Sequence, residues 1–199
     1  MKIKKMWKIV LATVAVLIVG LLASLLIMYY LDQTSRKLYQ DQTLGVSFSF
    51  DKHYQETPSD DSQVKYFERT APQGFLTVKY EKGLRGIASR LGRTIQDHIY
   101  LEIQQFYPVR YGETYKSVSL KKTTVIGREA VEHIFTYTDK DGRPNEVKLV
   151  AIVFDTDSAY YFVEQAHETL FDVIKEDLTP LFKTLVLTGP APAPAEESH

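Results

Sequence analysis

The feature that most constrains this chain is a run of 23 residues without a charged side chain, from Ile9 to Leu31. At about 1.5 Å of rise per residue, a helix of this length covers about 34 Å, more than the roughly 30 Å hydrocarbon core of a bilayer. A cleaved signal peptide usually has a shorter apolar region that ends in small residues. This run ends instead in Tyr29, Tyr30 and Leu31. It therefore predicts an uncleaved transmembrane helix over residues 9–31.

The flanks of the run predict its orientation. Residues 1–8 carry four basic side chains and no acid: Lys2, Lys4, Lys5 and Lys8. Positive charge favours the cytoplasmic side, so we expect a cytoplasmic stub, with the C-terminal domain outside a cell membrane that is crossed once. Trp7 at one end and Tyr29 and Tyr30 at the other are predicted to lie at the membrane interfaces.

The composition of the chain is that of a folded domain. Hydrophobic residues make up 44% and charged residues 25%, and 13 Tyr and 10 Phe can build a core. The absence of cysteine excludes disulfides, thiolate nucleophiles, Cys-ligated zinc and a lipidated-cysteine anchor. Without the four N-terminal lysines, 20 basic residues face 25 acidic ones. Because this remainder is mildly acidic, nucleic acid is not an expected partner.

The sequence divides further into three parts. Residues 32–42 are polar and are predicted to be a short spacer. Residues 43–188 carry the patterns of a folded domain. Residues 189–199 begin with alternating Pro and Ala and are predicted to be a disordered Pro/Ala tail, because such a composition favours extended conformations and cannot pack.

Most of the domain shows strand patterns. Apolar and small residues alternate in Gly45–Phe50, as in a half-buried strand. Tight links at 139–142 and 155–157 predict antiparallel hairpins. The run Leu149–Phe154 lacks polar alternation, which predicts a strand covered on both faces. The further expected strands are Val64–Arg69, Phe75–Tyr80, Tyr115–Val125, Ala130–Thr138, Glu146–Asp155 and Ser158–Ala166.

Two helices are expected beside these strands. Thr94 and Asp97 form a capping-box pattern before a stripe that we assign to Ile95, Ile99, Ile103 and Phe106, and Pro108 is expected to end this helix. Thr169 and Asp172 repeat the capping pattern, and Pro180 should kink or restart the second helix. The order of elements predicts an α+β fold, an antiparallel sheet flanked by helices.

Four stretches resemble a known family. Leu44–Phe50 is similar to the opening strand of the PsbP-like extracytoplasmic domains, and Thr124–Ala130 is similar to their x-Gly-Arg-x-Ala turn. The pair 146–166 resembles their central hairpin, and Leu181–Leu187 their closing helix and tail. The resemblance covers about residues 38–188.

The resemblance implies an α/β/α sandwich used for binding or assembly. Plant and cyanobacterial members attach to photosystem II, a eukaryotic relative binds a small GTPase, and many bacterial members are anchored in envelopes. One departure stands out: the family's Pro-x-x-Trp-like segment is replaced by 51–54, and the only tryptophan is Trp7. Fold alone does not transfer a function.

No motif predicts a catalytic, cofactor or metal site. The stretch 139–142 begins like a calcium loop, but Arg143 and Val150 occupy positions where that loop needs oxygen ligands, so a hairpin turn explains it. No two of the five histidines have metal-ligand spacing. His133 shares a strand face with Val131 and Phe135, and is predicted to be a hydrogen-bonded core residue.

One segment stands out from the acidic background. Residues 79–93 carry several cations and three glycines. Lys82, Arg85, Arg90 and Arg93 are therefore candidates for contact with anionic headgroups, a phosphate-bearing polymer or an acidic partner. The alternative is a solvated connector before a helix.

These observations favour a non-catalytic, membrane-anchored binding or assembly module, bacterial and extracytoplasmic, whose partner is another envelope protein. The alternative is an anchored envelope enzyme that uses carboxylates and His133, which requires a pocket bringing His133 to an acid of perturbed pKa. A third possibility, recruitment through the anchor helix, has weak support because Gly20 is the only glycine in that helix.

Overall fold

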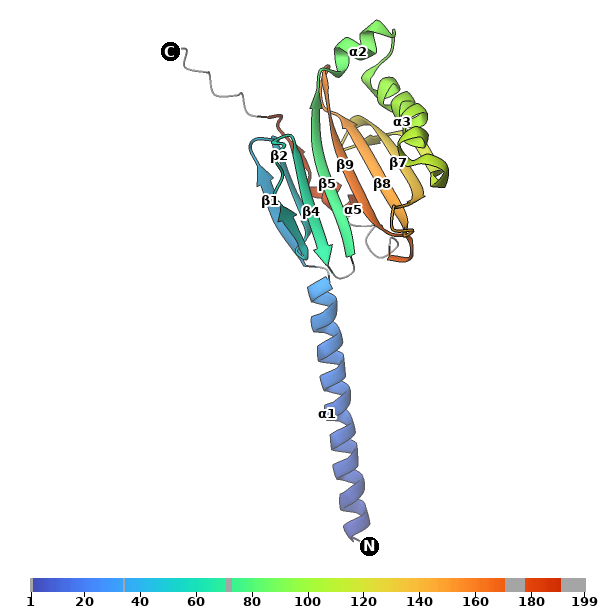
Figure 1. Cartoon of the computed structure of the whole chain (residues 1–199). Coiled ribbons are helices and arrows are strands. Elements are labelled where there is room, and N and C mark those ends of the chain that lie inside the picture. Colours follow the sequence, from blue (N-terminus) through green and yellow to red (C-terminus); the bar gives the residue numbers. More distant parts are fainter. Residues whose placement is uncertain (1, 34, 71–72, 171–177, 191–199) are drawn as a thin grey trace. The chain divides into compact units, whose positions relative to one another are not determined.

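The computed structural model describes residues 2–33, 35–70, 73–170 and 178–190. The chain divides into two compact units, with the boundary between Arg36 and Lys37. The first unit is helix α1, Lys2–Gln33 (Figure 1). Within the part of the chain that the structure describes, no helix combines the length and the apolar character needed to cross a membrane.

The second unit contains two antiparallel sheets. The larger one has seven strands in the order β3-β4-β5-β9-β8-β7-β6, and the smaller one has the order β1-β2-β10 (Figure 1). Strands β6 to β9 follow one another as a meander, which confirms the predicted hairpins. The strands are β1 Arg36–Asp41, β2 Val46–Asp51, β3 Tyr54–Thr57, β4 Val64–Thr70, β5 Gln73–Lys82, β6 Lys116–Val125, β7 Arg128–Thr138, β8 Pro144–Val153, β9 Ser158–His167 and β10 Val186–Leu187.

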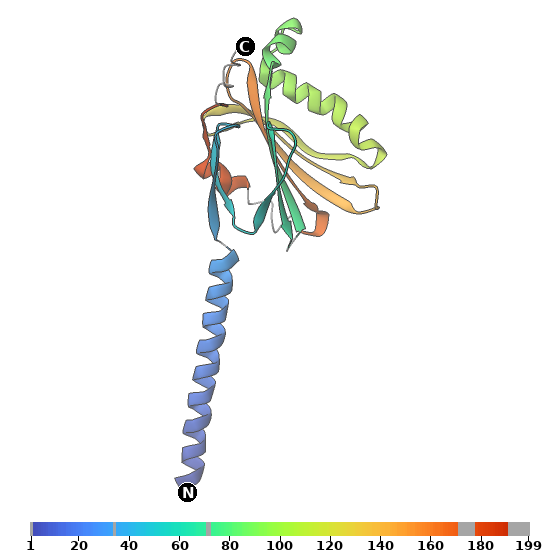
Figure 2. The same cartoon turned by 60° about the vertical axis from the view of Figure 1, so that its left-hand side comes forward.

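The large sheet is covered on both faces. Helices α2, Leu84–Arg90, and α3, Ile95–Tyr111, pack on one face, and the small sheet and α5, Leu178–Thr184, pack on the other (Figures 1 and 2). Strand β8 shows this directly, since Val150 belongs to one core and Leu149 to the other. The expected α+β sandwich is confirmed for this unit, and so is the expected double coverage of Leu149–Phe154.

Helix α3 begins as predicted and ends later. Thr94 accepts from the Asp97 backbone N–H, and the Asp97 side chain accepts from the Thr94 N–H, which completes the capping box. The helix continues past Pro108 to Tyr111, so the predicted end at Pro108 is wrong. Phe106 is 61% exposed, and Tyr107 packs against the core in its place. The buried row repeats every four residues, which brings position 107 rather than 106 onto the face of Ile99 and Ile103.

The edges of the domain differ most from expectation. The range predicted as a spacer contains β1, and β3 was not predicted. Gly45, just before β2, has φ +64°. It lies so close to the carbonyl of Gly189, near the other end of the domain, that a Cβ at Gly45 would clash with it. The predicted Asp172 cap and the greater part of the predicted tail, residues 191–199, lie outside the described residues. Pro180 lies in the first turn of α5.

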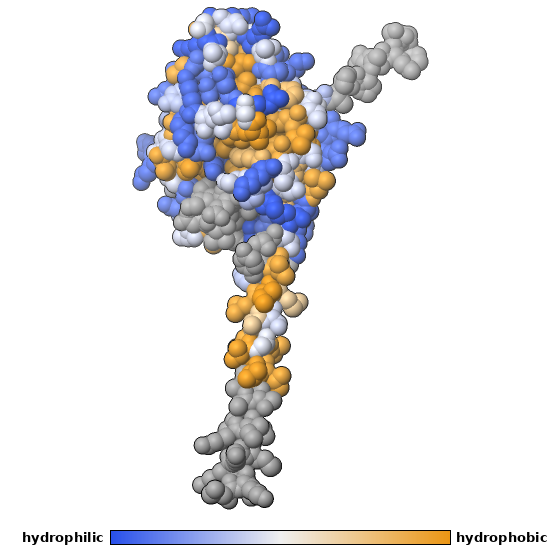
Figure 3. All heavy atoms as spheres, turned by 180° about the vertical axis from the view of Figure 1, so that it is seen from behind, coloured by the Kyte–Doolittle hydropathy of each residue, from blue (hydrophilic) through white to orange (hydrophobic). Residues whose placement is uncertain are grey.

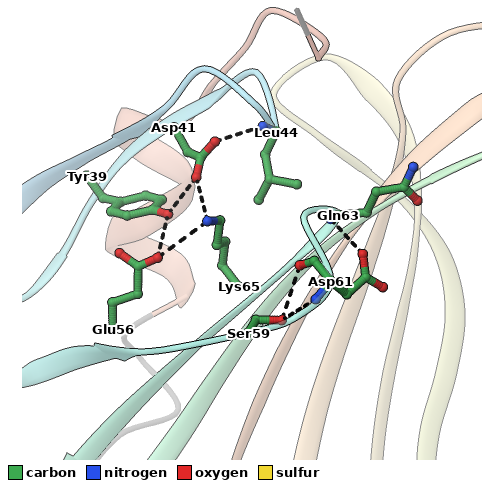
Figure 4. Close-up of polar contacts among 8 residues, drawn as sticks. All are labelled: Tyr39, Asp41, Leu44, Glu56, Ser59, Asp61, Gln63 and Lys65. Atoms are coloured by element: carbon green, nitrogen blue, oxygen red, sulfur yellow. Dashed lines mark hydrogen bonds and ion pairs between the residues drawn. The ribbon is translucent and has the colours of Figure 1, made fainter. Parts of the chain in front are cut away.

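A polar cluster links the two sheets (Figure 4). Asp41 on β1 accepts from the Leu44 backbone N–H at 2.9 Å, and its other carboxylate oxygen lies 3.1 Å from Lys65 Nζ on β4. Lys65 also lies 3.6 Å from Glu56 on β3, and the Tyr39 hydroxyl donates to Asp41. Because each charge has a partner of opposite sign, this cluster has a structural explanation.

Candidate functional site

A cleft of about 480 Å3 opens between α3 and the part of the large sheet that α3 does not cover. Helix α3 packs mainly on β6, β7 and β8, so the sheet face at β4 and β5 stays accessible beside it (Figures 1 and 2). This volume is in the range of pockets that bind small molecules or short peptide segments. Five aromatic rings line it, and we call it the tyrosine cleft: Tyr66, Tyr107, Tyr111, Phe135 and Tyr161.

Strand register builds the floor of the tyrosine cleft. Tyr66 on β4 pairs with Thr77 on β5, which pairs with Val163 on β9 and then Leu149 on β8. Since side chains alternate between the two faces of a sheet, residues in such a row point to the same side. Tyr66 remains 45% exposed because no helix lies over β4.

Helix α3 supplies the wall. Ile99, Ile103, Tyr107 and Tyr111 follow one another at intervals of four residues, and all line the cleft. The first two residues are buried against the sheet, and the tyrosines follow where the helix approaches its end. The wall therefore changes from aliphatic to aromatic along the helix.

Charges on the rim are balanced. Lys79 Nζ lies 2.8 Å from Glu81 Oε2 and 5.5 Å from the centre of the Tyr161 ring. Arg110 lies over the Tyr111 ring, with its Cζ 5.8 Å from the ring centre. Glu102 is the second acid in the lining. Two cations and two acids give the cleft no strong preference for an anion or a cation.

Three tyrosine hydroxyls of the cleft, those of Tyr107, Tyr111 and Tyr161, remain protonated at neutral pH. Burial raises the pKa of Tyr107 and of Tyr111. Burial also raises the pKa of Tyr161, and the neighbouring Glu81 carboxylate adds to that effect. A protonated phenol can donate as well as accept a hydrogen bond, so the cleft offers donors beside apolar ring faces.

His133 is a core residue, as the sequence predicted. Its side chain is fully buried and stacks on Phe135 with ring centres 4.9 Å apart. Nδ1 lies 2.7 Å from the Ser119 carbonyl oxygen and must donate to it, so Nε2 accepts from the Tyr115 hydroxyl at 2.9 Å. Both ring nitrogens are therefore engaged, and no carboxylate shares either contact.

Acid is expected to destabilise the domain through His133. Burial lowers the pKa of His133 below its ordinary 6.5, so the unfolded chain takes up the proton first as the pH falls. The contribution of neutral His133 to the free energy of unfolding is fully present above about pH 6.5. It is lost as the pH falls towards the pKa of the folded state, by at most about 1.4 kcal/mol per pH unit for one proton. Urea unfolding of wild type and His133→Gln across this window measures the effect. Equal pH slopes in the two proteins would contradict it.

The structure does not bring the four predicted basic residues to one place. Arg85 and Arg93 line a hollow of about 320 Å3 that also contains Glu129 and Asp155. Burial raises the pKa of Asp155, but hydrogen bonds from Asp157 and Ser158 outweigh this effect, so the pKa lies below its ordinary value, and the charge of Lys82 adds a smaller lowering effect. Arg90 is exposed at the end of α2 and does not line the hollow. The acids beside Arg85 and Arg93 offset their charge.

The turn between β7 and β8 is explained without a metal. Asp139 Oδ1 accepts from the backbone N–H groups of Asp141 and Arg143, and Asn145 donates to Oδ2 of the same carboxylate. These bonds lower the pKa of Asp139. Among the residues that the structure describes, no three His, Asp or Glu side chains are grouped so that they could hold a metal ion.

The tyrosine cleft was not predicted from the sequence. One signal was present: tyrosines at 107 and 111 extend the four-residue spacing of the isoleucines in α3. The contributions of Tyr66 and Tyr161 could not be read in the same way, because they come from strands that α3 leaves uncovered.

No family model and no curated protein sequence matches the chain. Solved structures do match the domain. Cyanobacterial PsbP (CyanoP) from Synechocystis sp. PCC 6803 has a TM-score of 0.56 at 10% identity, over 77% of this chain and 92% of that one. The domain has a PsbP-like fold.

Two further structures share this fold. LpqN of Mycobacterium tuberculosis, described as involved in cell envelope biogenesis, has a TM-score of 0.53 at 10% identity, over 77% of this chain and 91% of that one. The Ran-binding protein Mog1p of Saccharomyces cerevisiae has a TM-score of 0.56 at 5% identity, over 78% and 96%. The chain spans about half, 48%, of a matching protein from Bacteroides thetaiotaomicron. At these identities the likeness concerns the fold alone.

Proposed function

We propose that this chain is a non-catalytic binding module, anchored in the cell membrane and facing outward, whose binding site is the tyrosine cleft. The observation that carries the proposal is the cleft itself, which is open and aromatic, with hydrogen-bond donors and paired charges. Aromatic side chains supply much of the affinity in recognition sites. Of the described side chains that line the cleft, none is a serine, histidine or cysteine that could act as an activated nucleophile or imidazole base.

The composition of α1 supports the anchor. Its described side chains from Val16 to Met28 include many apolar ones that are more than half exposed, and apolar spheres surround this part of the helix in Figure 3. Such a surface is stable in lipid and unfavourable in water. The basic residues before Ile9 support an inward N-terminus. The module would then meet other proteins of the envelope.

A photo-crosslinking residue placed at position 66 in the full chain tests the binding proposal in native membranes. We expect it to capture a specific envelope component, because position 66 lies on the cleft floor and is accessible. The same residue placed at position 121, whose side chain is 59% exposed on edge strand β6, is the matched control. Equal capture patterns from both positions would refute the assignment of the site.

Carbonate extraction and protease digestion of the same membranes test the anchor separately. The full chain should remain membrane-bound in alkaline carbonate and should dissolve only in detergent, whereas a chain without residues 9–31 should be released. External protease should digest the domain in intact spheroplasts. Release of the full chain by carbonate would refute the anchor.

A further inference from the structure

The tyrosine cleft has the properties of a groove for polyproline II segments. A polyproline II helix has no internal hydrogen bonds, so its carbonyl oxygens need outside donors. Grooves that bind it use aromatic rings as surfaces for the proline rings. Here Tyr66, Tyr107 and Tyr111 supply rings from two sides of the cleft. Phenols that burial keeps protonated, such as Tyr107 and Tyr111, supply the donors.

The chain itself carries a segment of matching chemistry. Residues 190–195 read Pro-Ala-Pro-Ala-Pro-Ala, followed by Glu196 and Glu197. Proline fixes φ near −65° and has no N–H, so this segment presents mainly acceptors and loses little entropy on binding. The cleft rim holds Arg110, which makes no ion pair among the described residues and could meet the two acids.

Geometry favours a segment from a second copy over the same chain's own segment. The Thr188 backbone N–H donates to the Gly45 carbonyl at 2.8 Å, and Gly189 lies against the Phe154 ring. Phe154 packs on Tyr160, on the sheet face opposite to that of Tyr161. A chain that leaves on that face would have to pass around the sheet to enter its own cleft.

We propose that the tyrosine cleft binds the Pro/Ala segment, residues 190–197, of a second copy of this protein. The inference rests on the proposed function, since it names a partner for the same cleft. Two copies related by a twofold axis would exchange their segments, each placing its acids beside the other's Arg110. Anchoring both copies in one membrane raises their effective concentration for this exchange.

The direct test uses a labelled synthetic peptide of residues 188–199 and the full chain shortened after Pro190, with one copy per nanodisc. Saturable binding is expected. A peptide with Ala at positions 190, 192 and 194 should bind at least about tenfold more weakly, and so should the parent peptide to Tyr66→Ala protein. Phe106→Ala, on an exposed face of α3 outside the cleft, is the matched control and should bind normally.

Self-association of the complete chain decides between one copy and two. Association is measured by energy transfer between labels on two copies in one nanodisc. It should be lost when residues 191–199 are removed. Equal binding of the proline and alanine peptides, or binding that Tyr66→Ala leaves unchanged, would overturn the inference. So would peptide binding without tail-dependent association. If the peptide fails to bind while position 66 still crosslinks a different envelope component, the inference fails and the proposed function stands; if both fail, neither survives.

Discussion

Replacing Arg69 by Met is expected to lower the free energy of unfolding of the domain by about 3–5 kcal/mol. Arg69 and Asp51 are each 3% exposed, and Arg69 Nη1 lies 2.8 Å from Asp51 Oδ2. Removing the guanidinium leaves the Asp51 carboxylate buried without its opposite charge, although His53 still contacts its other oxygen. The cost arises mainly from this uncompensated charge. Urea unfolding followed by circular dichroism measures the change.

Two further variants identify the source of the loss. In Asp51→Asn/Arg69→Met the side chain at 51 is neutral and can still accept the hydrogen bond from the His53 backbone N–H, so this double variant should recover much of the lost stability. Arg90→Met removes a cation from an exposed position and should change stability by less than about 0.5 kcal/mol. A single Arg69→Met variant that loses less than about 1 kcal/mol would show that the pair contributes little.

The parts of the fold that could be predicted from sequence are those set by local patterns. Strands β6 to β9 are joined by short turns of residue types suited to hairpins, so their order and pairing follow from neighbours in the chain. The start of α3 was equally local, since the Thr94–Asp97 capping box needs only four residues. His133 was correctly placed in the core because its strand alternates with apolar neighbours.

The parts that could not be predicted depend on distant contacts. Strand β1 carries Arg36, Lys37 and Asp41 and has no apolar alternation, so its composition is typical of a linker. It is ordered by β2 and by the cluster that joins Asp41 to Lys65 on β4. The polar composition of β3 hides a strand for the same reason.

The tyrosine cleft exists because α3 covers only part of the large sheet. Periodicity shows which side of a helix is buried, but it does not show how far that helix lies across a sheet of seven strands. Tyr66 and Tyr161 are separated by 95 positions and meet only through the register of β4, β5 and β9. A site assembled in this way has no motif in the sequence.

Replacing Phe48 by Ala is expected to cost about 3–5 kcal/mol of unfolding free energy. Phe48 is fully buried between the two sheets. Its ring centre lies 5.3 Å from that of Tyr39, 5.5 Å from that of Phe50 and 6.1 Å from that of Phe162. Truncation therefore removes contacts with both sheets at once and leaves a cavity that the surrounding rings can fill only in part. Urea unfolding measures the change.

Conservative and surface variants provide the controls for Phe48. Phe48→Leu keeps most of the buried volume and should cost clearly less than the alanine variant. Phe106→Ala, which removes a ring that is 61% exposed, should change stability by less than about 0.5 kcal/mol. An alanine variant at position 48 that is as stable as wild type would mean that the small sheet packs only loosely on the large one.

Comparing Phe48→Leu with Tyr66→Ala separates the stability of the domain from binding in the cleft. Phe48 lies in the core between the sheets, whereas the tyrosine cleft lies on the opposite face of the large sheet, against α3. Below its unfolding transition, Phe48→Leu should therefore bind the proline peptide as tightly as wild type does. Tyr66→Ala should show the reverse, weak binding with little loss of stability, because the Tyr66 side chain is half exposed. If peptide binding instead fell in proportion to stability across both variants, the loss of binding would result from loss of the folded state, and the cleft would not be the binding site.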